Sequence, residues 1–278
     1  MKAYSYIFAI ALMTGLFSCT KDNNSKAQDE VKELQLTTTL TNSTHKLELY
    51  TQNGKFTTGY NAIFIQAKDL DGNNIEIEQA SWKPIMHMTS MSHACPYSSI
   101  QKKADATHTY EGFIVFQMAG NDMEGWEISI DYTANGADFT ATAPIQVLQA
   151  EKRRSEAFKG SDDIKYVLAL VEPTEPKVGI NDMKAILYKM ENMMSFVPVT
   201  NYSIEIDPRM PGMGNHGSPN NVHLSNVSDG FYNGKLSLTM TGYWKINLRL
   251  LDASQTVLKG EEVDDTNESS SIYFEIEF

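Results

Sequence analysis

Methionine, histidine and cysteine gather in two short segments of this chain, and these are side chains suited to binding a soft metal ion. The candidate ligands are Met86, Met88, Met91, His93 and Cys95 in the first segment, and Met210, Met213 and His216 in the second. Thioether, imidazole and thiolate groups together favour Cu(I), with Cu(II), Zn(II) and Ag(I) as competitors. Neither segment contains a carboxylate. The residue types therefore predict a soft-metal site in each segment.

The spacing of these donors decides how each segment must fold to bring them together. In an extended chain Met86 and Met88 project from one side, and so do Met91 and His93. A loop that folds one pair over the other would present three or four donors to one ion. The donors of the second segment are three residues apart, so a site there requires a bend, which Pro211 and the glycines beside it permit. Methionine also fills protein cores readily, so packing remains the alternative for all of them.

Cys95 has no partner for a disulfide within the chain. The chain has two cysteines, and the other, Cys19, is the expected site of lipid attachment. His93 and Met91 lie just before it in the sequence, which favours a metal ligand. A buried thiol that acts as a small hydrophobic group fits equally well.

The remaining aromatic, glycine and methionine positions are expected to serve packing. Trp126 and Trp244 should lie in the core, and Gly112 and Gly234 should allow a tight entry into a strand. The methionines assigned to core or loop packing are Met118, Met240, Met183, Met190, Met193 and Met194.

An internal repeat relates the two segments. The frame Tyr110, Gly112, Met118, Gly120 and Trp126 recurs as Tyr232, Gly234, Met240, Gly242 and Trp244. The tyrosines are 122 positions apart, and the Gly-x-Asn at 59–61 recurs at 179–181 with an offset of 120. Such steady offsets predict two tandem domains of about 120 residues.

Alternating apolar residues between Gly, Asn, Asp and Pro predict short antiparallel strands in both units. Examples are 126–132 in the first unit and 244–250 in the second. The fold class expected is all-β, with two tandem immunoglobulin-like β-sandwich domains at 33–150 and 164–278. A linker is expected at 151–163, where the charged residues 151–156 form either the one candidate helix or a solvated connection.

The N-terminus has the features of a targeting segment. Residues 1–18 hold Lys2 and an apolar run too short to span a membrane, which needs about 20 residues. Leu16-Phe17-Ser18-Cys19 resembles the lipobox of bacterial lipoproteins, which implies cleavage before Cys19 and its lipidation. A polar tether is expected at 19–32. The protein is therefore expected in the bacterial cell envelope, lipid-anchored to the outer membrane, with the periplasmic and the surface-exposed face both open.

The charge of the chain argues against two classes of partner. The full sequence has 23 basic and 35 acidic residues, and removal of Lys2 with the leader changes the formal charge from −12 to −13. Such a surface repels nucleic acid and anionic lipid headgroups, so neither is expected as a partner.

The second unit resembles the YtkA-like family, which is related to FixH-type domains. The residues that carry the resemblance run from Met210 to His216, then Tyr232-x-Gly234 and Met240-x-Gly242-x-Trp244. The first unit resembles it less well, because it lacks the Pro-Gly spacing and inserts residues 121–125. The resemblance implies an immunoglobulin-like sandwich in the bacterial envelope, beside metal-efflux or oxidase-assembly proteins. It makes Met210, Met213 and His216 the motif positions.

The sequence is compatible with two functions. The first is an envelope protein that binds copper, as Cu(I), or another soft metal for buffering, resistance or delivery. The second is a metal-free interaction or spacer module of an export or assembly complex, in which methionine-rich loops make adaptable protein contacts. No enzyme is expected, because no spacing marks a nucleophile, a base and an orienting group.

Overall fold

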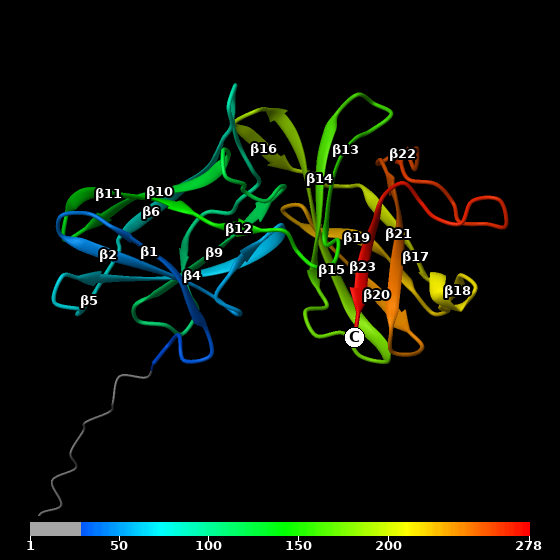
Figure 1. Ribbon diagram of the computed structural model, residues 1–278, viewed down its shortest axis with the longest axis horizontal. Helices are drawn as coiled ribbons and strands as arrows, with labels where there is room; N and C mark the ends of the chain where they lie inside the picture. Colours follow the sequence, from blue (N-terminus) through cyan, green and yellow to red (C-terminus); the bar gives the residue numbers. More distant parts are fainter. Residues whose placement is uncertain (1–28) are drawn as a thin grey trace, which may run out of the picture.

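A computed structural model describes residues 29–278, and strands joined by turns build this part of the chain (Figure 1). The all-β prediction is confirmed, and the one helical element in the described range is a 3-10 turn at Pro211–Met213. The expected leader at 1–18 and the lipidation site Cys19 lie outside the described residues. Across 29–278, no helix has the length and apolar content needed to cross a bilayer.

The N-terminal domain is a sandwich of two antiparallel sheets. One sheet has the order β1 (Gln35–Thr41), β2 (His45–Thr51), β4 (Gly59–Asp69), β9 (Thr109–Phe116) and β8 (Gln101–Lys102), with β5 (Asn74–Ile75) paired to β4. The other has the order β11 (Ala137–Ile145), β10 (Gly125–Ala134), β6 (Gln79–His87) and β7 (Ser92–Ala94). A short parallel pair joins β3 (Phe56–Thr57) and β12 (Val147–Leu148). The core between the sheets includes Trp82 and Trp126.

The C-terminal domain also has two layers around a core, but here a single continuous sheet folds over to form both layers. Its strand order is β13 (Ser155–Lys159), β14 (Lys165–Glu172), β15 (Gly179–Asn192), β20 (Phe231–Leu238), β19 (Val222–Ser228), β17 (Ser203–Met210), β21 (Tyr243–Leu251) and β22 (Val257–Lys259). Three further strands pair beside this path: β16 (Ser195–Pro198) with β15, β18 (His216–Gly217) with β17, and β23 (Tyr273–Glu277) with β21. Because β19 pairs with both β20 and β17, the two layers are joined.

The repeated Tyr and Asn positions make the same contacts in both domains. The Tyr110 hydroxyl donates to the Ile77 carbonyl at 2.8 Å, and the Tyr232 hydroxyl donates to the Val199 carbonyl at 3.0 Å. The Asn61 side-chain amide donates to the Gly59 carbonyl at 2.8 Å, and Asn181 repeats this bond to Gly179 at 3.1 Å. These residues therefore recur because, in each sandwich, their side chains form the same hydrogen bonds to backbone carbonyls of the connecting segments.

The repeated tryptophans and glycines also have structural roles. Trp126 and Trp244 are fully buried, which confirms the core prediction. A Cβ on Gly112 would lie 2.7 Å from Cζ2 of Trp82, and a Cβ on Gly234 would lie 2.4 Å from the Val222 carbonyl oxygen. Both glycines lie within strands, and close approach of a neighbouring group explains them.

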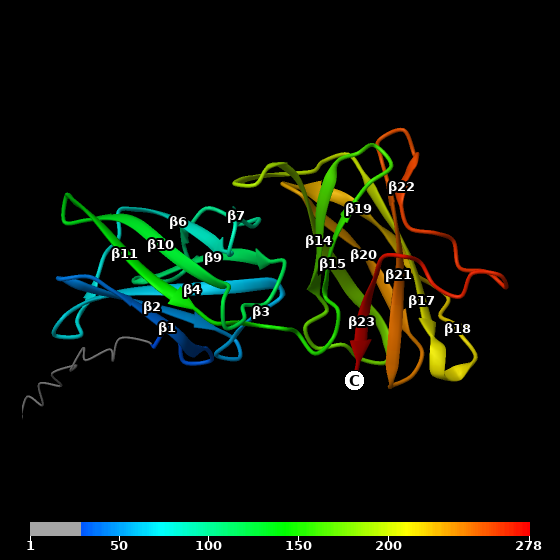
Figure 2. The same cartoon turned by 45° about the horizontal axis from the view of Figure 1, so that its top comes forward.

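A third apolar cluster joins the two domains. Strand β9 turns Ile114 and Phe116 into the N-terminal core, whereas Phe113 and Val115 face the C-terminal domain. The buried residues of this interface are Phe113, Val115, Val167, Ala169, Val171, Ile186 and Tyr188. Strands β9, β14 and β15 meet between the domains in both ribbon views (Figures 1 and 2). The continuous apolar runs in these strands are therefore buried on both faces.

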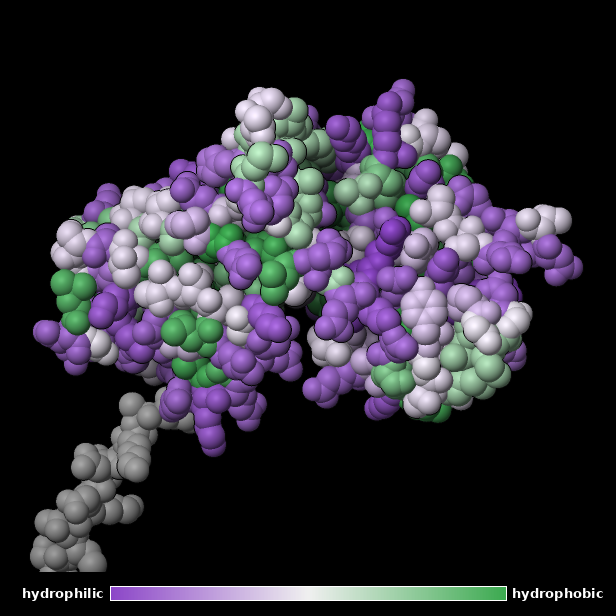
Figure 3. Space-filling model, viewed as in Figure 1, coloured by the Kyte–Doolittle hydropathy of each residue, from purple (hydrophilic) through white to green (hydrophobic). Residues whose placement is uncertain are grey.

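The visible surface is largely hydrophilic, in keeping with the acidic composition (Figure 3). At its upper edge, between the two domains, lies a group of moderately hydrophobic residues. Figure 1 places the β6–β7 turn and the β15–β16 hairpin there.

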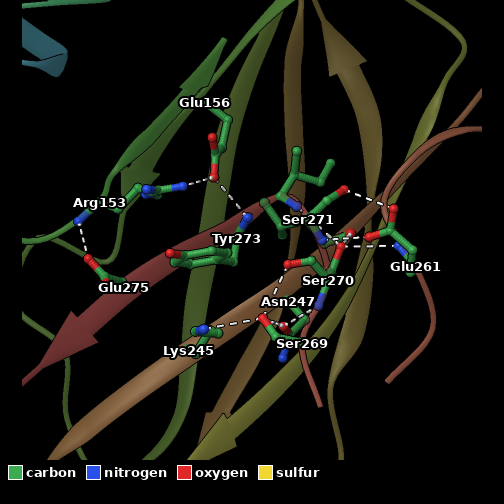
Figure 4. Close-up of polar contacts among 12 residues, drawn as sticks. Arg153, Glu156, Lys245, Asn247, Glu261, Ser269, Ser270, Ser271, Tyr273 and Glu275 are labelled. Carbon is green, nitrogen blue, oxygen red and sulfur yellow. Dashed lines mark hydrogen bonds and ion pairs between the residues drawn. The ribbon is translucent and has the colours of Figure 1, made fainter. Parts of the chain in front are cut away.

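The charged segment at 151–156 forms no helix, which corrects that expectation. Arg153 and Glu156 bind β23 (Figure 4): the Arg153 amide donates to the Glu275 carboxylate at 2.8 Å, and the Tyr273 amide donates to Glu156 at 3.0 Å. Strand β13 then begins at Ser155, inside the expected linker. These distant partners in β23 outweigh the local i,i+4 pairs that would support a helix.

The expected tether is shorter than 19–32 at its C-terminal end. Glu30 accepts hydrogen bonds from the Thr107 and His108 amides and from the Thr109 hydroxyl, and Val31 is buried. Partial desolvation raises the pKa of Glu30, but these hydrogen bonds outweigh it and lower the pKa to about 2. The chain is thus attached to the N-terminal domain from Glu30 onward.

Candidate functional site: two Met-His pairs

Strands β6 and β7 bring the first group of candidate ligands together. Met86 lies directly opposite His93 in this antiparallel pair, and the Met88 amide donates to the Met91 carbonyl at 2.9 Å to close the turn. Side chains directly opposite each other in such a pair are in contact range. Met86 is buried, Met88 is half-buried against the core, and Met91 is 51% exposed. Folding of one donor pair over the other, as the sequence predicts, is what this hairpin does.

The geometry of His93 determines which ring nitrogen is available. Nδ1 lies 2.8 Å from the Ala94 carbonyl oxygen, which only accepts, so Nδ1 carries the hydrogen. In the neutral ring Nε2 then holds the free lone pair. The ring lies edge-on to Trp126, with centroids 5.5 Å apart and planes at 87°. A histidine whose other nitrogen donates to a backbone carbonyl is the usual arrangement of a metal ligand in proteins.

The C-terminal domain repeats the Met-His pair at β17 and β18. Met210 lies directly opposite His216. The 3-10 turn at Pro211–Met213 and Gly214, at a φ of 65°, make the bend that the sequence predicts. Met210 is buried with its methyl group near Gly242, whereas Met213 is 58% exposed and His216 is exposed.

Each pair sits beside the repeated tryptophan strand. Trp126 pairs with Met86, and the register of β17 with β21 ends one step before Met210 would face Trp244. The two tryptophan side chains bond equivalent carbonyls, those of Met118 at 2.9 Å and Met240 at 3.0 Å. The domains differ in access, because His93 is buried and His216 is exposed.

Cys95 lies fully buried in the N-terminal core, although the sequence also proposed it as a metal ligand. Burial raises the pKa of its thiol well above the usual range, which disfavours the thiolate that a metal requires. The structure therefore favours packing, the second of the two explanations that the sequence left open.

Two of the other methionines do not lie where the sequence predicted. Met183 is buried as expected, but Met118 and Met240 are each 37% exposed. The alternation that suggested burial stops because β9 ends at Phe116 and β20 ends at Leu238. The sequence assigns Met193 and Met194 to strand or loop positions, and they form the turn at the tip of the β15–β16 hairpin, where both are exposed.

The donor types available at these pairs fit a soft cation. Within residues 29–278, no three side chains of the His, Cys, Asp and Glu types come together in a group able to hold a metal ion. Methionine sulfur is the donor that the two Met-His pairs add to imidazole, and thioether donors favour Cu(I) or Ag(I) over hard cations.

Comparison with known proteins agrees with the sequence resemblance for the second half of the chain. Residues 159–249 match the YtkA-like family model. These residues of the C-terminal half therefore form a YtkA-like domain. This match includes the Met210–His216 pair and the Trp244 strand. No functionally curated protein matches the chain in sequence.

Three solved structures have partial similarity to this chain. One is a DUF4785 family protein from Legionella pneumophila, with 10% identity and a TM-score of 0.25 over 77% of this chain and 53% of that one, so the present chain spans about half its length. Two titin fragments, one a tandem of immunoglobulin domains, match 70% and 73% of this chain and 90% and 89% of their own, each at 10% identity, with TM-scores of 0.19 and 0.18. Similarities this low carry no argument about the function of the YtkA-like domain.

Proposed function

We propose that this protein is a lipid-anchored protein of the bacterial envelope that binds Cu(I), or a related soft cation, for buffering, resistance or delivery. The observation that carries the proposal is His93, whose Nδ1 is held by the Ala94 carbonyl while its ring lies across from Met86. The hydrogen bond at Nδ1 fixes the tautomer and the ring orientation, as in metal-bound histidines, and leaves Nε2 as the nitrogen that could bind a metal.

The same donor pair occurs in the YtkA-like domain, which supports a shared role for both. The candidate ligands are Met86, Met88, Met91 and His93 in the first domain, and Met210, Met213 and His216 in the second. Bound Cu(I) would supply no reaction of its own in this proposal, because sulfur and imidazole donors suit storage or transfer. The acidic surface raises the local concentration of cations.

The proposal is tested by anaerobic Cu(I) titration of a soluble form of the protein, from Lys21 onward and without the lipid anchor, against a chromophoric chelator. One variant carries Met88→Leu, Met91→Leu and His93→Gln, and another carries Met213→Leu and His216→Gln. We expect each variant to lose about one equivalent of bound Cu(I), because each removes the donors of one domain. Met→Leu changes conserve volume and so keep the fold.

A matched control is Met183→Leu, which changes a buried methionine of the C-terminal core that lies opposite Gly234 in the sheet and not opposite a histidine. This variant should bind the same number of Cu(I) equivalents as the unchanged protein. If the unchanged protein fails to compete with the chelator at all, the copper proposal is wrong.

A metal-free interaction module is the second candidate, and the exposure of Met91 and Met213 favours it. Methionine is adaptable at protein contacts, and these two turns lie in different domains. Proteins of metal efflux or oxidase assembly would be the partners. In that case Met91→Leu and Met213→Leu would weaken partner binding while Cu(I) has no effect on it.

The lipid anchor is a separate part of the proposal and rests on Cys19. The described chain begins at the lower side of the N-terminal domain in Figure 1, and the β6–β7 turn lies at the upper side of the same domain. An anchor at Cys19 would leave this turn accessible. We expect a clickable fatty-acid analogue to label the protein in cells and Cys19→Ser to abolish the label, while a labelled Cys19→Ser protein would exclude the anchor there.

A further inference from the structure

The tip of the β15–β16 hairpin crosses from the C-terminal domain to the candidate site of the N-terminal domain. The Ala94 amide donates to the Met193 carbonyl at 2.9 Å. Ala94 follows His93 directly and belongs to β7, which is the last strand of its sheet. The hairpin tip therefore covers the open edge of the strand that carries His93.

The interface holds this hairpin in place. Ile186 and Tyr188 of β15 belong to the apolar cluster between the domains, and Phe196 of β16 packs against the same cluster. The hairpin extends from this cluster to its tip at Met193 and Met194. Its contact with β7 is thus part of a packed interface.

The residue types at the tip are unusual for a turn. Two-residue hairpin turns favour Gly, Asn and Asp, which adopt positive φ or bond their own backbone. Here the tip is Met193-Met194, and neither residue has positive φ. The turn is shaped instead by the Asn192 side chain, which accepts from the Met194 amide at 2.9 Å. The backbone geometry of the turn therefore does not require methionine at either position.

Both side chains are exposed, and so is that of Met91 in the β6–β7 turn. Met193 is 38% exposed, and Met194 and Met91 are each 51% exposed. These residues belong to the β15–β16 hairpin and the β6–β7 turn, which lie together at the upper edge of Figure 1, where Figure 3 shows the group of moderately hydrophobic residues. An unbranched side chain with three rotatable bonds can turn its sulfur toward a ligand at low cost.

We infer that Met193 and Met194 supply thioether ligands to the soft-metal site at Met91 and His93, so that the N-terminal site is shared by both domains. This inference rests on the proposed function. The ligand class is a monovalent soft cation, because the donors are thioethers and one neutral imidazole. A cation held by both domains also stabilises their interface by mass action.

The test uses the full mature chain with ¹³C-labelled methionine methyl groups and titrates it with Ag(I), which is redox-inert. The methyl resonances of Met193 or Met194 should shift together with that of Met91, at the same stoichiometry. The double variant Met193→Leu, Met194→Leu should bind Ag(I) at this site at least tenfold more weakly. Met123→Leu is the matched control, since Met123 is an exposed methionine of the N-terminal domain outside the proposed site.

Each outcome separates this inference from the proposed function. If Met91 shifts while Met193 and Met194 do not, or if the double variant binds as tightly as the control, the shared site is wrong and the proposed function stands. If no methionine methyl in either domain shifts, the proposed function fails as well.

Discussion

Replacing Val115 with aspartate is expected to separate the two domains while each keeps its own fold. Val115 is fully buried on the face of β9 that points away from the N-terminal core, within the interdomain cluster. An unpaired carboxylate there costs several kcal/mol. Separation relieves this cost because each domain has an independent core.

Small-angle scattering and NMR relaxation measure this effect. The radius of gyration should rise, and the two domains should tumble with shorter correlation times. Val222→Asp is the matched control, because it makes the same chemical change at a valine that is 54% exposed. An unchanged radius of gyration in Val115→Asp would mean that the interface tolerates the charge and that burial of Val115 does not hold the two domains together.

The same variant bears on the site. Separation of the domains breaks the hydrogen bond between the Ala94 amide and the Met193 carbonyl and removes the hairpin from β7. The Met86–His93 pair lies within the N-terminal domain and should survive. Soft-metal binding should therefore weaken without being abolished.

Replacing Gly234 with alanine is expected to destabilise the YtkA-like domain by about 1–3 kcal/mol, the usual cost of inserting a methyl group into a packed site. The new Cβ would lie 2.4 Å from the Val222 carbonyl oxygen and 3.1 Å from the carbonyl carbon of His223, so backbone of β19 must move. Because β19 joins the two layers of this domain, the pairing of β20 with β19 is the contact at risk.

Urea denaturation followed by tryptophan fluorescence measures this change through the Trp244 transition. Gly125→Ala is the matched control: Gly125 opens β10, has ordinary φ, and nothing lies within 4 Å of its added Cβ. The control should stay within about 0.5 kcal/mol of the unchanged protein. Equal urea midpoints for Gly234→Ala and Gly125→Ala would show that β19 moves aside without loss of stability.

The sequence indicated the position of the candidate site because its donors are close together along the chain. Met86 through His93 span one hairpin, and Met210 through His216 span one bend, so local spacing was enough to predict that each set would fold together. The residue pairing itself was not predictable, since it depends on the register of β6 with β7 and of β17 with β18. The tautomer of His93 likewise depends on the backbone around Ala94.

Nothing in the two candidate segments of the sequence indicated that the β15–β16 hairpin would lie beside the N-terminal site. Met193 and Met194 lie about 100 residues from His93 in the sequence, and methionine in a strand-rich chain is usually core. One clue was available: two methionines interrupt the polar residues of a turn.

By itself, the sequence determined the strands, the tandem repeat and the sandwich class, because side-chain alternation and turn residues are local properties. It also placed Trp126 and Trp244 in their cores. Tertiary structure alone decided that β9 and β14 are buried on both faces, that Met118 and Met240 are exposed, and that Cys95 is packed. These outcomes depend on where strands end and on which distant segments meet them, and a local pattern has no information about either.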